Sequence, residues 1–200
     1  MPSKTNKKHQ KELKRKQLKK QRKLVELTYD QYSALQASLF PINECIVPDN
    51  LFELGIGHLS ISRTLPNGKL AFAKFLLDVF CLGVKDISYS VLAPHEYHDN
   101  IVIMKNISEY STVSPAYFKT LIVQAVDYAN KLDLAPHKNY SKVIKILKDI
   151  NCDDSKFNFG KDGKPFYFRG PNESWKQAEQ IIHHLEKKLG KDNYMTAIEK

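Results

Sequence analysis

The sequence predicts an α+β fold: an antiparallel meander and a second β-hairpin packed by helices, preceded by a basic N-terminal arm. Two glycine-containing turns, Pro66-Asn67-Gly68 and Asp162-Gly163, lie between apolar segments and are typical of β-hairpins. Segments with strand character and segments with helical periodicity are grouped along the chain instead of alternating, which favours α+β over a doubly wound α/β fold. Of the 200 residues, 42% are hydrophobic, which is enough to form the core of a globular domain.

The first hairpin joins residues 56–65 to residues 69–80 through Asn67-Gly68, a preferred centre of a two-residue type I′ turn. Residues 87–92 form the third strand of the meander, after a loop at residues 81–86. His58 and Asp78 are then expected on opposite faces of the sheet. In this register one face carries the pairs Arg63 with Phe72, Ile61 with Lys74, Leu59 with Leu76 and Gly57 with Asp78, and the other carries His58, Ser60, Ala73, Phe75 and Leu77.

Helices are predicted mainly after the meander. Pro94 begins one over residues 94–106, and Ser114-Pro115 begins another that ends near residue 132 and carries an apolar stripe. Residues 140–150 form a shorter helix, and residues 174–189 form one that Gly190 ends, with a last helical piece from Asp192. Before the meander, residues 41–50 are expected to be an irregular connection and residues 51–54 at most one helical turn.

The second hairpin is predicted around Asp162-Gly163. It places Phe159 opposite Phe166 and Phe157 opposite Phe168, so that four phenylalanines share one face. A hydrophobic core explains that face best, although aromatic rings between lysines can also stack on nucleic-acid bases. Tyr167 on the opposite face and Arg169 are the better candidates for contacts with nucleic acid.

The positive charge of the chain is confined to its N-terminal arm. Residues 1–24 hold 11 of the 31 Lys and Arg residues and one acid, Glu12, for a net charge of +10, whereas residues 25–200 hold 20 bases and 21 acids, for a net charge of −1. The arm lacks the apolar face of a core helix, so it is expected to be helical or disordered, and residues 25–200 are expected to form a single α+β domain.

Dense cations without aromatic residues point to a polyphosphate partner more than to a membrane surface. We therefore expect an RNA-binding protein that associates with ribosomal RNA or a ribosomal particle. The remaining alternatives are a solubilising tail, an anionic lipid surface and an acidic protein partner. The expected phosphate contacts are Lys7, Lys8, Lys11, Lys14, Arg15, Lys16, Lys19, Lys20, Arg22 and Lys23.

An enzyme with its site around residues 81–86 is the alternative function. Asp78 lies inside an apolar segment, where an unpaired carboxylate is costly to bury, and it could act as an acid or base there. Cys81 could act as a nucleophile, with Lys85 and Asp86 beside it. The competing interpretation of Asp78 is a carboxylate on a solvated face or one paired with Lys74.

The sequence carries no recognised metal or cofactor motif. The segment His95-Glu96-Tyr97-His98-Asp99 has its histidines at i and i+3, not at the i and i+4 of a zinc-protease helix. The three cysteines are far apart and odd in number, which indicates a reducing, cytoplasmic location. No apolar segment approaches the length of a membrane span. We expect no cofactor, no metal and no membrane association, and the oligomeric state is open.

Three segments together resemble a family of uncharacterised bacterial proteins of similar size that also carry basic N-terminal arms. They are residues 44–57, residues 78–86 (Asp-Val-Phe-Cys-Leu-Gly-Val-Lys-Asp) and residues 159–167 (Phe-Gly-Lys-Asp-Gly-Lys-Pro-Phe-Tyr). The resemblance covers roughly residues 44–194. It implies a bacterial cytosolic protein and assigns no functional residue.

Overall fold

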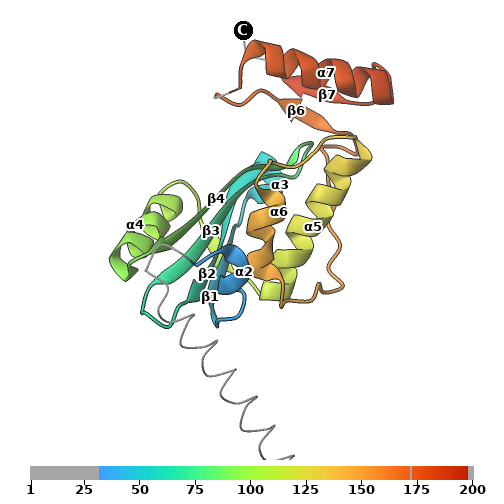
Figure 1. Cartoon of the computed structure of the whole chain (residues 1–200). Helices are drawn as coiled ribbons and strands as arrows, with labels where there is room; N and C mark the ends of the chain where they lie inside the picture. The colour runs from blue at the N-terminus through green and yellow to red at the C-terminus, as the bar shows by residue number, and fades with distance from the viewer. Residues whose placement is uncertain (1–31, 172, 198–200) are drawn as a thin grey trace, which may run out of the picture.

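The computed structural model describes residues 32–171 and 173–197. Its centre is a five-stranded antiparallel sheet in the order β4-β3-β2-β1-β5 (Figure 1). The α+β class and the meander at its centre are confirmed, and two further strands extend the meander. The strands are β1 (Ile42–Pro48), β2 (Ile56–Thr64), β3 (Leu70–Asp78), β4 (Gly83–Leu92) and β5 (Tyr110–Thr112).

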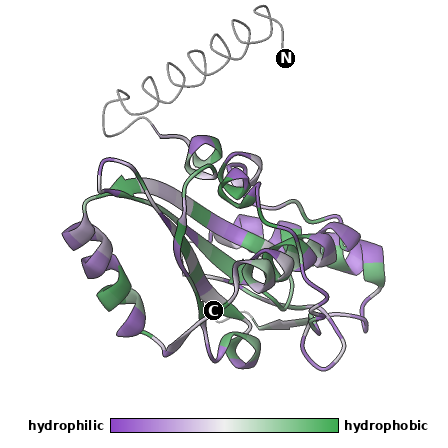
Figure 2. Ribbon diagram, turned by 90° about the horizontal axis from the view of Figure 1, so that it is seen from below, coloured by the Kyte–Doolittle hydropathy of each residue, from purple (hydrophilic) through white to green (hydrophobic). Residues whose placement is uncertain are grey.

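Helices cover both faces of this sheet. On one face α5 (Pro115–Lys131), α2 (Ala34–Ala37), α6 (Tyr140–Val143) and the 3₁₀ helix η1 (Ile144–Leu147) enclose the main core. On the other face α4 (Pro94–Lys105) packs Ile101 and Met104 against Ile46 and Phe72. In Figure 2 the strands carry much of the hydrophobic colour, between α4 on one side and the larger helical layer on the other.

Local sequence signals place the two long helices as predicted. Ser114 caps α5 by accepting the N–H of Tyr117, and the predicted stripe from Phe118 to Ala129 is buried. The last long helix, α7 (Trp175–Leu189), begins after a capping box at Ser174 and ends at Gly190. The single turn α3 (Leu51–Leu54) lies where the sequence predicts it.

The predicted register of the first hairpin is wrong by one residue. Gly68 has φ +78° and donates its N–H to the Leu65 carbonyl, while the Leu65 N–H donates to the Lys69 carbonyl, so three residues form the turn. Ile61 therefore pairs with Ala73, and a one-residue shift exchanges the faces of one strand relative to the other. By the pairing of β2 and β3, His58 and Asp78 share a strand face, contrary to the prediction.

The predicted irregular connection before the meander is a strand. β1 pairs with β2 on one side and with β5 on the other, which makes it an inner strand of the sheet. A register shift between Ile42 and Glu44 interrupts its alternation, and the residues from Cys45 to Pro48 are buried on both faces. A prediction that looks for alternating apolar and polar residues does not detect a strand that is buried on both faces.

The predicted second hairpin is reduced to its turn. Asp162 and Gly163 both have positive φ, and Lys161 and Lys164 exchange backbone hydrogen bonds, as in a two-residue type I′ turn. No strand pair extends from this turn. Instead β6 (Phe166–Phe168) pairs in parallel with β7 (Met195–Ala197), where a helical piece was predicted.

Two other boundaries differ from the predictions. The predicted loop at residues 81–86 is mostly strand, because β4 begins at Gly83. The predicted helix at residues 140–150 is α6 followed by η1. Within residues 32–171 and 173–197, the structure contains no helix long and apolar enough to cross a membrane.

Candidate functional site

Asp78 shapes the turn between β3 and β4. Its Oδ1 accepts the N–H groups of Phe80 at 2.9 Å and Cys81 at 2.8 Å, which fixes the chain as it leaves β3. Its Oδ2 is buried and has no hydrogen-bond partner among the described residues. Burial raises the pKa of this carboxyl to about 6, against the opposing effects of the backbone N–H groups of residues 80–82 and of the Lys85 charge. Asp78 is thus a buried turn residue and does not pair with Lys74 in an ion pair.

Cys81 lies in a second apolar core. It is fully buried with Leu82, Tyr167 and Leu185, where the β3–β4 turn meets α7. Burial and the nearby Asp78 charge both raise the pKa of its thiol. Because the thiolate is the nucleophilic form, this environment works against nucleophilic catalysis by Cys81.

Lys85 forms a buried ion pair that the sequence did not reveal. Its Nζ lies 3.1 Å from Oε2 of Glu173, and the two side chains are 13% and 18% exposed. The two groups form an ion pair without a hydrogen bond between them. The same carboxylate oxygen accepts the Gly170 N–H at 2.7 Å and the Tyr167 hydroxyl at 3.2 Å. Glu173 therefore links β4 to β6 and to the start of α7.

The other candidate residues near this turn are not arranged as a catalytic centre. Asp86 is exposed, and its carboxylate lies 3.8 Å from the His137 ring. No proton acceptor is recorded within hydrogen-bond distance of the Cys81 thiol among the described residues. The grouping of Asp78, Cys81 and Lys85 is explained by packing of the C-terminal elements against the sheet.

Tyr167 and Arg169 belong to the same junction. Tyr167 is 0% exposed, so the prediction that it faces outward is wrong and its ring offers no surface to a base. Arg169 donates from Nη1 to the Glu173 carbonyl at 2.7 Å, and its guanidinium lies 4.3 Å from the centre of the Trp175 ring. The guanidinium is therefore committed to contacts within the chain.

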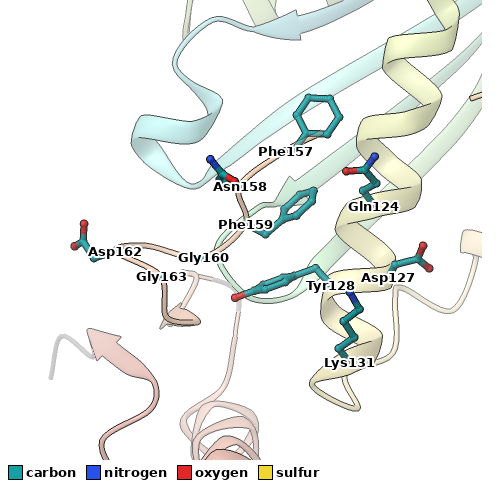
Figure 3. A pocket seen from close by; sticks show the side chains of 10 residues that line it. All are labelled: Gln124, Asp127, Tyr128, Lys131, Phe157, Asn158, Phe159, Gly160, Asp162 and Gly163. Carbon is teal, nitrogen blue, oxygen red and sulfur yellow. The ribbon is translucent and has the colours of Figure 1, made fainter. Parts of the chain in front are cut away.

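A groove of about 700 Å³ runs along α5. Figure 3 shows its two walls: four side chains from α5, and the segment from Phe157 to Gly163 opposite them. Tyr128 stacks on Phe159 at 5.4 Å, and Gln124 donates to the Ser155 carbonyl at 2.7 Å. The lining residues are Gln124, Asp127, Tyr128, Lys131, Phe157, Asn158, Phe159, Gly160, Asp162 and Gly163.

Phe157 separates this groove from a second one of about 550 Å³. Its ring packs on Phe52 at 5.8 Å and on Tyr117 at 5.1 Å. Phe157 and Phe159 thus face α3 and α5 instead of pairing with Phe168 and Phe166. The charged residues of the first groove are Asp127, Asp162 and Lys131, so the groove lacks the cationic excess of an anion site.

Two points remain, the metal ligands and the predicted contacts of the arm. Among the described residues, no group of three His, Cys, Asp or Glu side chains is placed to hold a metal ion. The ten predicted arm contacts at residues 7–23 lie outside the described residues, as does the boundary of the arm at residue 24.

The comparisons add no relative on which a role could be based. No protein-family model, curated protein or solved structure matches this chain. The resemblance to a bacterial family therefore stays a prediction, and the function has to be argued from the residues of this chain.

Proposed function

We propose that this protein binds structured RNA through its basic arm, with ribosomal RNA or a ribosomal particle as the target. The observation that carries the proposal is the separation of charge: +10 in residues 1–24 against −1 in residues 25–200. Each lysine or arginine that neutralises a phosphate releases condensed counterions, so such an arm binds tightly and with little dependence on sequence. The near-neutral domain then contributes placement.

The alternatives are less well supported by the same residues. Residues 1–24 contain no aromatic residue and few aliphatic ones, so a membrane surface would gain little apolar burial from them. The alternative enzyme would depend on Asp78 and Cys81, whose side chains are buried and serve the packing of the β3–β4 turn. A cytoplasmic location is part of the proposal, because it brings the chain together with RNA.

The experiment measures the affinity of the full chain for a structured ribosomal RNA fragment over a series of salt concentrations. The arm variant replaces Lys7, Lys8, Lys11 and Lys14 by glutamine, and the matched control replaces Lys105, Lys176, Lys187 and Lys191, which are exposed and have no recorded ion pair. The logarithm of the binding constant falls with the logarithm of the salt concentration, and each lost phosphate contact makes this slope less steep by about 0.7 to 0.9. The slope of the arm variant should therefore be less steep than that of the wild type by about 3.

The control variant should retain the slope of the wild type. Equal slopes for the arm variant and the wild type would refute the proposal. Competition decides the class of partner: a polyglutamate of equal charge that displaces the RNA as well as unlabelled RNA does would favour an acidic protein, and anionic vesicles that do so would favour lipid.

A further inference from the structure

A row of lysines lies on the segment that leads through α6 and η1. Lys138, Lys142, Lys145 and Lys148 are all exposed and follow one another at intervals of four, three and three residues, as on one side of a helix. None of them forms an ion pair with another residue that the structure describes. The opposite side of this segment is buried in the main core through Val143, Ile146, Leu147 and Ile150.

The row differs from an ordinary solvated helix face. The outer face of α7 mixes both signs, with Lys176, Lys187 and Lys188 beside Glu179 and Glu186. Residues 136–150 instead contain one acid, Asp149. The exposed side of an amphipathic helix needs polar residues, but these residues need not all carry the same charge. The positive potential of the row is therefore not explained by packing of the segment against the core.

The one acid of the segment is already neutralised. Both carboxylate oxygens of Asp149 accept hydrogen bonds from the buried guanidinium of Arg63, at 2.5 and 3.2 Å. Two further acids, Asp86 and Asp127, act only near the first part of the row, where they lie close to His137 and to Tyr140. Asp153 and Asp154 follow Lys148 by five and six residues, so the excess of positive charge belongs to residues 136–150 and not to the chain beyond them.

The Lys148 end of the row lies beside α2, near the first described residue of the chain. η1 packs against α2, whose first residue is Ala34, and Figure 1 shows both elements at the same end of the sheet. Arg63 also donates to the carbonyls of Ser38 and Phe40, at 3.2 and 2.6 Å, which ties the chain after α2 to the end of η1. The row is therefore held in a fixed position relative to residue 32.

We infer that the lysine row is a second phosphate-contacting surface, which the RNA backbone follows from the arm onto the domain. From Lys142 in α6 to Lys148 at the end of η1, six residues at about 1.5 to 2.0 Å each give a span of about 9 to 12 Å, and Lys138 lies in the turn before α6. A nucleic-acid strand that follows the row therefore places several phosphates within reach of the four lysines. The inference rests on the proposed RNA binding and adds where on the domain the RNA lies.

The test is a row variant of the full chain in which Lys138, Lys142, Lys145 and Lys148 are glutamine. Its affinity for the same RNA fragment is measured against salt, beside the wild type, the arm variant and the matched control. Glutamine removes the charge and keeps a polar side chain of similar helical tendency, and circular dichroism checks that the variant is folded. We expect the slope to fall by about 3 relative to the wild type, with binding at low salt retained through the arm.

The possible results are distinct. A row variant with the slope of the matched control, beside an arm variant that loses about 3, overturns this inference and leaves the proposed function standing. Absence of salt-dependent RNA binding in the wild type overturns both. A row variant that loses slope while the matched control does not supports the inference, because the control removes the same total charge from α4 and from α7 and the residues after it.

Discussion

The two ends of the large sheet are closed by buried charges of opposite sign, and the two charges are compensated to different degrees. At the end near α2, Arg63 is 1% exposed; its Nη1 and Nη2 donate to two carbonyls and to the carboxylate of Asp149, while its Nε has no hydrogen-bond partner among the described residues. At the other end Asp78 is equally buried, but one of its carboxylate oxygens has no hydrogen-bond partner among the described residues. The charge of Arg63 is stabilised by hydrogen bonds and an ion pair, whereas burial destabilises the charged form of Asp78 and raises its pKa.

This difference indicates that the packing at the α2 end of the sheet depends on a single side chain, that of Arg63. Arg63 connects β2, the chain after α2 and the end of η1 through a single guanidinium. The other end is held by several groups, because Glu173, Lys85 and the core around Cys81 all contribute to it. A buried charge with several partners is costly to remove, since each partner loses its bond at once.

The largest effect is expected from Arg63→Met. The substitution leaves the carbonyls of Ser38 and Phe40 without their donor and removes the partner of Asp149, and we expect the free energy of unfolding to fall by about 3 to 5 kcal/mol. Urea unfolding followed by circular dichroism measures it. Asp149→Asn is the matched variant: this side chain is 48% exposed and the amide oxygen still accepts, so about 1 kcal/mol is expected. A loss below 1 kcal/mol for Arg63→Met would contradict the comparison.

Asp78→Asn should change the pH dependence of stability. The folded-state pKa of Asp78, about 6, lies above its ordinary value of 3.8, so stability is fully present below pH 4 and is lost as the pH rises through 6. A shift of about two pKa units corresponds to about 3 kcal/mol. The variant should therefore gain up to this amount relative to the wild type between pH 4 and pH 7 in urea unfolding.

Asp99→Asn is the control for this pH effect. Asp99 is exposed on α4 and forms no ion pair with another described residue. Its variant should keep the pH dependence of the wild type. If the stability difference between the wild type and Asp78→Asn does not change with pH, the carboxylate of Asp78 is not destabilised by burial.

Glu173→Ala should loosen the C-terminal end by a smaller amount. Its carboxylate is the shared acceptor for Lys85, Tyr167 and the Gly170 N–H, and its loss should cost about 2 kcal/mol. Trp175 is the one tryptophan of the chain and lies in the first turn of α7, so its fluorescence reports this end. Tyr167→Phe removes one of the three contacts and should cost about 1 kcal/mol. Equal losses for the two variants would show that Glu173 acts only through Tyr167.

The features that could be predicted from the sequence depend on neighbouring residues. Ser114 followed by Pro115 begins α5, Ser174 begins α7, and Gly190 ends it, because caps act within one turn of a helix. The Asp162-Gly163 turn forms for the same local reason. These parts of the fold follow from short-range geometry.

The features that were missed depend on residues far apart in the chain. β1 is identified as an inner strand only through β5, and the parallel pairing of β6 with β7 has no local signal. The register of β2 and β3 depended on whether the turn held two or three residues. In the candidate site, Glu173 was missed because it meets Lys85 across 88 positions, and the lysine row gains its meaning from its place beside α2.

The two glycine turns offer the smallest and most closely matched test of the two ends. Gly68 and Gly163 have φ +78° and +77°, and an added Cβ would meet no atom within 4 Å at either position. Alanine therefore adds only the cost of the left-handed backbone, about 1 kcal/mol at each site, and asparagine should cost less. Gly68 joins two nine-residue strands near Arg63, while the turn at Gly163 carries no strand pair. If both ends unfold together, both alanine variants lower the urea midpoint equally; a loss at Gly68 alone would show that the Gly163 turn opens separately from the sheet.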